Sequence, residues 1–225
     1  SAQTYQTLFW VAFVPAVISV LVLTRITDQP GAPHERESIS QNWQALSPAF
    51  KRFLLPAGIF ALAYFSLGFL LLKAHDAGFS VAQIVLLYAL FNTTCVIAAP
   101  LVGKLGDRVG RSRIIVLGYT LYGLINLGLV FTTSRWEITV AFAFYGFFYS
   151  IDESQSKAFI ADLEPERRAT AVGVYNFVTG VLYLPASLVA GALWTVSPGL
   201  ALGLAAGLSL VAIIVFWFMR PASGS

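Results

Sequence analysis

Three charged residues interrupt one of the most apolar stretches of this sequence. The segment FYSIDESQSKAF, Phe148–Phe159, places Asp152, Glu153 and Lys157 directly after the uncharged run ITVAFAFYGF. Glu153 and Lys157 are four residues apart with the glutamate first, which is the favourable order for an ion pair along a helix. Glu153 can therefore be neutralised locally, whereas Asp152 has no opposite charge at that spacing.

Asp152 belongs to a helical stripe that also carries Tyr145, Tyr149 and Ser156. A carboxyl group without a nearby cation prefers its protonated form when it is removed from water. Asp152 or Glu153 can therefore take up a proton or contact a cationic substrate. The alternative is structural, because the three charges can also form a buried clamp that fixes two parts of the molecule together.

The composition indicates that the helix carrying these charges lies in a membrane. The chain has 225 residues, of which 57% are hydrophobic and 11% charged. Soluble domains carry about 25% charged residues. A water-soluble protein of this length cannot cover so much apolar surface, so lipid is the expected solvent and partner.

Seven stretches are long enough to cross a bilayer, which takes roughly 20 largely apolar residues. They are Tyr5–Thr24, Phe53–Leu72, Val81–Val102, Ile114–Thr133, Ile138–Ala161, Thr170–Trp194 and Leu200–Met219. The long connector 25–52 is expected to be a surface linker with a short amphipathic helix around Asn42–Phe50. The fold class is therefore an all-α polytopic membrane protein. In the fifth span, Asp152 lies roughly 15 Å inside Asp162, near the middle of a core about 30 Å thick.

The basic residues are divided unequally between the two sides of the membrane. Alternate connectors lie on opposite sides, and one side carries Arg25, Arg36, Lys51, Arg52, Lys104, Arg108, Arg111, Arg113, Arg167, Arg168 and Arg220. The other side carries only Lys73 and Arg135. The positive-inside rule places the first set, and with it the C-terminus, in the cytoplasm. The net charge of +3 thus reflects topology, and no nucleic-acid partner is expected.

The connector GKLGDRVGRSR, Gly103–Arg113, is the most specific stretch of the chain. It resembles the signature loop of the major facilitator superfamily: glycine, three residues, Asp-Arg, one residue, Gly-Arg and a basic residue. The residues that match in register are Gly103, Asp107, Arg108, Gly110 and Arg111. Ser112 departs from the pattern, and Arg113 follows one place later. The stretch ADLEPERRATAVGVYN, Ala161–Asn176, also resembles the matching loop of many bacterial members.

The resemblance implies a cytoplasmic gate built from this loop. The glycines permit a tight turn. Asp107 is expected to face the N-terminus of the sixth span near Thr170, where a carboxylate is favourable. Arg111 is expected to pair with Asp162. In the family such contacts latch the cytoplasmic side, and Arg168 belongs to the same group of residues.

The resemblance also implies a missing part, because family members have twelve helices in two six-helix halves. The chain would correspond to the sixth through twelfth helices, as a fragment, a split half or a proteolysed product. Residues 1–24 are the sixth helix, 25–52 the central cytoplasmic linker, and 53–219 the C-terminal six-helix bundle. Residues 220–225 form a tail in which ASGS looks like a cloning scar. The N-terminal half is the expected partner.

Weaker polar stripes occur on two other spans. Asn176 leads a stripe with Thr179, Tyr183 and Ser187, and Asn92 lies between Tyr88 and Cys95. Such residues form interhelical hydrogen bonds more often than they contact ligands. We nevertheless include Asn92 and Asn176, with Tyr145 and Tyr149, in the expected substrate cavity.

The sequence contains no arrangement that favours an enzyme. It has one cysteine, two histidines in separate polar connectors, and no phosphate-binding glycine loop. We expect no catalytic residue, cofactor or metal site.

The expected function is secondary active transport of a small molecule by alternating access. The resemblance implies a bacterial efflux-type protein in the cell (inner) membrane, a proton-coupled exporter or antiporter. The alternatives are a proton-coupled importer of the same fold and a membrane scaffold or receptor that does not transport.

Overall fold

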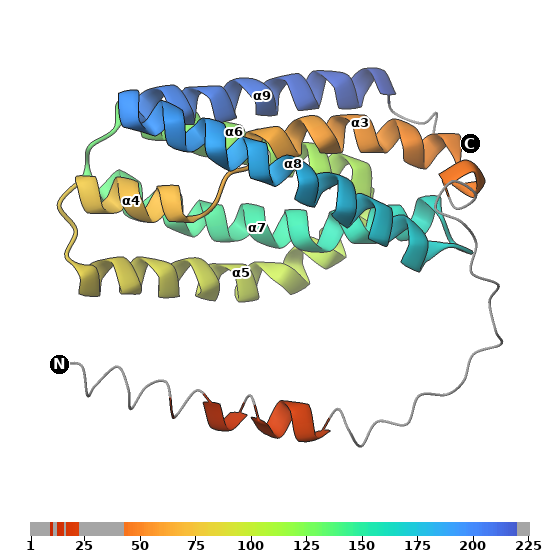
Figure 1. Ribbon diagram of the computed structural model, residues 1–225, viewed down its shortest axis with the longest axis horizontal. Helices are drawn as coiled ribbons and strands as arrows, with labels where there is room; N and C mark the ends of the chain where they lie inside the picture. Colours follow the sequence, from red (N-terminus) through yellow and green to blue (C-terminus); the bar gives the residue numbers. More distant parts are fainter. Residues whose placement is uncertain (1–9, 11–12, 16, 23–42, 220–225) are drawn as a thin grey trace. The chain divides into compact units, whose positions relative to one another are not determined.

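The computed structural model describes residues 10, 13–15, 17–22 and 43–219 (Figure 1). The chain divides into two compact units, Ser1–Asn42 and Trp43–Ser225. In the first unit, the described residues 10, 13–15 and 17–22 are helical. The rest of the expected span Tyr5–Thr24, the linker up to residue 42 and the tail 220–225 lie outside the described residues.

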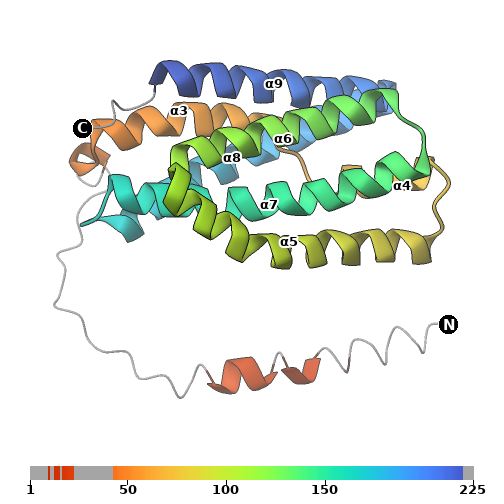
Figure 2. The same ribbon diagram turned by 180° about the vertical axis from the view of Figure 1, so that it is seen from behind.

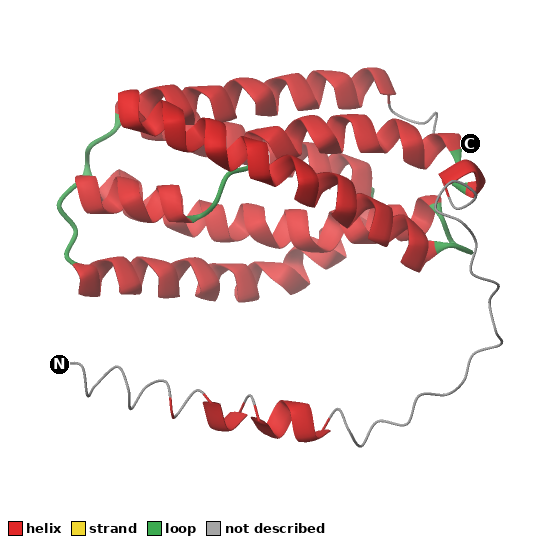
Figure 3. Cartoon of the chain, viewed as in Figure 1, coloured by secondary structure: helices red, strands yellow, loops and turns green. Residues whose placement is uncertain are grey.

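The second unit is a bundle of helices that run roughly along one axis, as Figures 1 and 2 show from opposite sides. They are α3 (Pro48–Ala63), α4 (Gly68–Asp76), α5 (Val81–Val109), α6 (Arg111–Phe131), α7 (Arg135–Leu163), α8 (Arg168–Val196) and α9 (Pro198–Met219). The described residues contain no strand (Figure 3). The protein is therefore all-α, as the sequence predicts.

Within the described residues, five helical segments are long and apolar enough to cross a membrane. They are Pro48–Asp76, which joins α3 and α4, together with α5, α6, α8 and α9. Helix α7 is as long as α5, with 29 residues, but its second half carries Asp152, Glu153 and Lys157. These helices make the chain a polytopic membrane protein.

The second expected span, Phe53–Leu72, lies within the apolar segment Pro48–Asp76, but two helices and not one form that segment. Helix α3 ends at Ala63, and α4 begins only at Gly68. The hydroxyl of Tyr122 donates a hydrogen bond of 2.9 Å to the carbonyl oxygen of Ala63, which supplies the freed carbonyl with a partner. Such a break is tolerated at membrane depth when the backbone is buried in protein.

The expected amphipathic helix around Asn42–Phe50 does not form as a separate element. Residues 43–45 form a helical turn, and α3 already begins at Pro48. The hydroxyl oxygen of Ser47 accepts a hydrogen bond of 3.1 Å from the amide of Phe50. A serine cap followed by proline is a strong start signal for a helix, so the end of the linker joins α3.

The signature stretch Gly103–Arg113 is helical almost throughout, although a loop was expected. Helix α5 continues to Val109, and α6 begins at Arg111. Gly110 alone separates them, with a φ of 100° that other residues rarely adopt. Polar residues need to leave the lipid, but they do not need to leave the helix. The polarity of this stretch therefore did not predict where α5 ends.

Aromatic rings fill the middle of the bundle and join three helices. Phe60 of α3 stacks on Tyr119 of α6 with ring centroids 3.8 Å apart. Phe148 of α7 lies edge-on to Phe60 at 5.9 Å and packs against Tyr122 at 4.8 Å. All four side chains are buried. Rings in offset or edge-to-face contact add stability beyond the area that they bury.

Helices α5 and α7 approach each other closely at Gly146. A Cβ atom at this position would lie 2.4 Å from the carbonyl oxygen of Phe91 and 3.1 Å from the amide nitrogen of Cys95. Both neighbours are backbone atoms, which cannot rotate away. Only glycine therefore permits this contact, as is common between helices packed in lipid.

We predict that Gly146→Ala destabilises the protein by about 1–3 kcal/mol, because the two helices must move apart. Thermal unfolding in detergent measures the effect. The matched control is Gly207→Ala in α9, where an added Cβ has no neighbour within 4 Å. Equal unfolding temperatures for the two variants would show that the α5–α7 contact is not tight in the protein.

Candidate functional site

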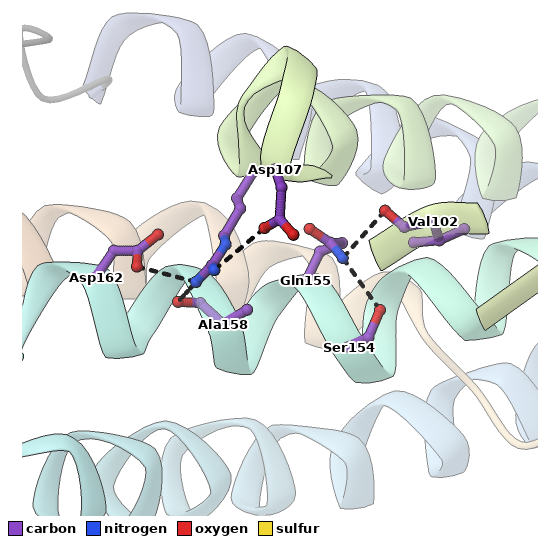
Figure 4. A network of polar contacts seen from close by, with 7 residues as sticks. Val102, Asp107, Ser154, Gln155, Ala158 and Asp162 are labelled. Atoms are coloured by element: carbon purple, nitrogen blue, oxygen red, sulfur yellow. Dashed lines mark hydrogen bonds and ion pairs between the residues drawn. The ribbon is translucent and has the colours of Figure 1, made fainter. Parts of the chain in front are cut away.

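The guanidinium group of Arg111 in α6 bonds to residues near the ends of α5 and α7. Its partners Asp107, Ala158 and Asp162 are labelled in Figure 4. It donates to Asp162 Oδ1 at 2.9 Å and to the carbonyl oxygen of Ala158 at 2.6 Å, both in α7. It also reaches Asp107 Oδ1 of α5 at 3.4 Å. We call the end of the bundle that holds this cluster the basic end.

The ion pair expected between Arg111 and Asp162 is present. Asp107, however, pairs with Arg111 and not with the start of α8 near Thr170. The reason is the continuation of α5 as a helix, with a single residue before α6, which keeps the two side chains close. Among the described residues, Arg111 is the one polar partner that the structure gives to Asp107.

The other residues of the expected gate have different surroundings. Arg108 and Arg168 are exposed. Gly103 is half-buried, and an added Cβ there would meet nothing within 4 Å. The close approach instead occurs at Gly106, where an added Cβ would lie 2.0 Å from Gln155 Oε1.

Gln155 was missed in the sequence and lies at the centre of this contact (Figure 4). Its side chain is buried, and Nε2 donates to the carbonyl oxygen of Val102 at 3.4 Å and to Ser154 Oγ at 3.3 Å. Its Oε1 has no hydrogen-bond partner among the described residues. The sequence signal that could have identified Gln155 is an amide side chain within an apolar helix. The proximity of Gln155 to Gly106 arises only when α5 packs on α7.

Glu164 is a second residue that the sequence did not single out. Its carboxylate is buried, with 7% of the residue exposed, and accepts a hydrogen bond of 2.6 Å from the amide of Ser47. A carboxylate at the start of α3 accepts a hydrogen bond from an amide that has no partner within the helix. Its negative charge is also favourable at the positive end of the helix dipole. Glu164 and Ser47 are 117 positions apart, so no local sequence pattern predicts their contact.

Asp152 is half-buried on α7. Asp152, Tyr119 and Ser156 line one small cavity between α6 and α7. The hydroxyls of Tyr119 and Ser156 have no hydrogen-bond partner in the described part of the chain.

Glu153 and Lys157 form the expected ion pair along α7. Their side chains are 57% and 43% exposed, so the pair lies on the surface of the described bundle. Glu153 directly follows Asp152 in α7, so the ion pair lies beside that carboxyl group.

The remaining cavity residues are not gathered at one place. Tyr145 is buried and packs against Phe91 at 5.8 Å between ring centroids. Tyr149 is half-buried and contacts the same ring at 5.5 Å. Asn92 is exposed and donates to the Tyr88 carbonyl of its own helix at 2.8 Å, and Asn176 is exposed on α8. The structure shows no polar contact between either asparagine and Asp152. Within residues 43–219, no three metal-ligating side chains lie together.

The chain is similar to proteins of one transporter family. The model of the Major Facilitator Superfamily matches residues 58–225. An uncharacterized MFS-type transporter of Methanocaldococcus jannaschii is 28% identical over 223 residues, which cover 96% of this chain and 56% of the relative. The chain thus spans little more than half the length of that relative. Because the family model matches well over half of its residues, the chain belongs to the Major Facilitator Superfamily.

Proposed function

We propose that the chain is the C-terminal part of a secondary transporter that moves a small molecule by alternating access. The observation that carries this proposal is the combination of family membership with a carboxyl group, Asp152, inside the bundle and without a cation bound to it. Intramembrane carboxyl groups are costly and mark ion or substrate pathways. The missing partner is an N-terminal half of the same fold, which the length of the relative supports.

We infer that Asp152 is the site at which proton movement is coupled to transport. Glu153 already has a cation in Lys157, whereas Asp152 has no ion-pair partner among the described residues and lines a cavity with apolar side chains and the hydroxyls of Tyr119 and Ser156. The unpartnered hydroxyls of Tyr119 and Ser156 line the same cavity. They can donate hydrogen bonds to the carboxylate, or one can accept a hydrogen bond from the acid. Asp152 can therefore be charged in one facing state and neutral in the other, which links proton uptake to the conformational change.

The Arg111 cluster would act as a latch at the basic end, which we assign to the cytoplasm. The cluster joins α6 to α5 and α7 through side chains that remain accessible to water, with Asp162 56% and Asp107 69% exposed. Exposed ion pairs contribute little, about 0.2–1 kcal/mol each. A latch of this strength can open and close during a transport cycle. Glu153 and Lys157 would lie at the surface covered by the missing half.

The contacts within this half of the molecule do not set the direction of transport. The direction depends on how proton binding and substrate binding are coupled in the whole transporter. We favour proton-driven export, because Ala161–Asn176 resembles the corresponding loop of bacterial efflux proteins. Proton-driven import uses the same coupling site. A scaffold or receptor of this fold would move no substrate in vesicles with or without a pH gradient.

One prediction of the proposed function concerns Asp152. In the whole transporter reconstituted in vesicles, Asp152→Asn should lower proton-driven flux by about 5- to 150-fold, the usual range of coupling between two sites. Substrate exchange without a gradient should persist, because it needs no net proton movement. The matched variant is Glu153→Gln, which should lower folded yield by leaving Lys157 unpaired. Normal proton-driven flux in Asp152→Asn would place the coupling site elsewhere.

The second prediction concerns the latch. Arg111→Gln removes the bonds to Asp162 and to the Ala158 carbonyl, so it should lower the transport rate about fivefold at unchanged membrane insertion. Arg108→Gln is the matched control, because Arg108 carries the same charge in the same turn region but is exposed. Rates are compared after normalising to the amount of inserted protein. If Arg111→Gln transports as fast as Arg108→Gln, the cluster has no part in the cycle.

The third prediction concerns orientation. A membrane-impermeant maleimide added to intact cells should label a cysteine at His75, which is exposed at the opposite end of the bundle from Arg111. Cysteines at Arg52 and Lys104 should react only after permeabilisation, because the positive-inside rule places them in the cytoplasm. The reverse pattern would invert every assignment of sides made above.

A further inference from the structure

A groove of about 340 Å³ runs between α6 and α9 at the basic end. The two helices are in direct contact farther along, where Ser209 Oγ donates to the carbonyl oxygen of Tyr119 at 2.6 Å. The groove opens between that contact and the helix ends, and it faces away from the cavity around Asp152. The proposed transport mechanism makes no use of it.

The floor and walls of the groove are apolar. Helix α6 contributes Val116 and Leu117, and α9 contributes Phe216 and Trp217. Thr120 also lines the groove, but its hydroxyl donates to the carbonyl oxygen of Val116 in its own helix at 2.8 Å. From Arg113 to Thr120 the helix rises about 10 Å, enough for the first part of an acyl chain.

The open end of the groove is positively charged. Arg113 lines it together with Ser112 and is exposed. Among the described residues, the Arg113 guanidinium makes one weak hydrogen bond, from Nη1 to the carbonyl oxygen of Val109 at 3.5 Å. Helix α6 starts beside this group without a side-chain cap on its first amides. Uncapped amides and the positive end of the helix dipole favour an anion here.

We propose that this groove binds one phospholipid with an anionic headgroup, taken from the leaflet at the basic end. The phosphate contacts Arg113 and the start of α6, and an acyl chain lies along Leu117, Phe216 and Trp217. The charge at one end and the apolar wall beyond it match the two parts of such a lipid. A soluble phosphate would use only the first part, and a second protein copy would leave the arginine without an anion. Trp217 is 62% exposed.

The test measures lipid binding at Trp217 in the whole transporter purified in detergent. Phosphatidylglycerol and phosphatidylcholine with the same brominated acyl chains are titrated, and tryptophan quenching is recorded. The contribution of Trp217 is the difference between the wild type and Trp217→Phe. We expect half-maximal quenching at about fivefold lower phosphatidylglycerol than phosphatidylcholine, the factor that corresponds to one basic residue near a lipid surface.

Arg113→Gln should remove this preference, whereas Arg52→Gln, another exposed arginine at the basic end, should preserve it. Leu117→Trp should fill the groove and weaken binding of both lipids. Glycerol phosphate, which has the headgroup anion without the chains, should not compete at equal concentration.

Three results would overturn the proposal. They are equal binding of the two lipids by the wild type, an unchanged preference in Arg113→Gln, and competition by glycerol phosphate as strong as that by the lipid. The first result needs no variant, so the proposal stays testable if Arg113→Gln does not fold. Loss of transport in any variant has no bearing on these outcomes, because only binding is measured.

Discussion

The close packing of α7 against α5 and α6 determines where the polar groups of this molecule lie. Gly146 allows the backbone of α5 to approach α7, and Gly106 makes room for the buried amide of Gln155. A third glycine, Gly118, brings α6 to Ile151, with an added Cβ only 2.7 Å from a methyl carbon of that side chain. In lipid, helices gain no hydrophobic energy by associating, so such contacts depend on shape and on the few polar bonds between helices. Arg111 can reach Asp162 because these three helices are held together.

The polar side chains of the bundle fall into two groups that differ in how their hydrogen bonds are satisfied. Thr120 and Thr179 donate to carbonyl groups of their own helices, and Glu153 pairs with Lys157 one turn away. Such residues need nothing from other helices. Tyr119 is different, because its buried hydroxyl has no hydrogen-bond partner among the described residues, and the half-buried Asp152 lines the same cavity. Unsatisfied polar groups are expensive in lipid, which is why they are the best indicators of function in this half of the molecule.

Neighbouring arginines at the basic end have different contacts. Arg111 turns toward α7 and binds its carboxylate and carbonyl groups, whereas Arg113, two residues later, borders the groove on the other side of α6. Residues two positions apart on a helix point in different directions, so neighbouring arginines can serve separate purposes. Glu164 adds a further link, because it joins the connector after α7 to the start of α3. A buried carboxylate therefore fixes the start of α3 beside the end of α7.

The sequence by itself determined the class of the protein, the family resemblance, most of the helices, and the two ion pairs Arg111–Asp162 and Glu153–Lys157. These follow from composition, hydrophobic length and short-range spacing, which do not depend on distant residues. The tertiary structure decided what depends on helix contacts. It ended α3 at Ala63, where the hydroxyl of Tyr122 satisfies the free carbonyl, and no glycine or proline in the sequence marked that position. It also placed Gln155 against Gly106 and Glu164 against Ser47, because a side chain finds such partners only after helices far apart in sequence have packed.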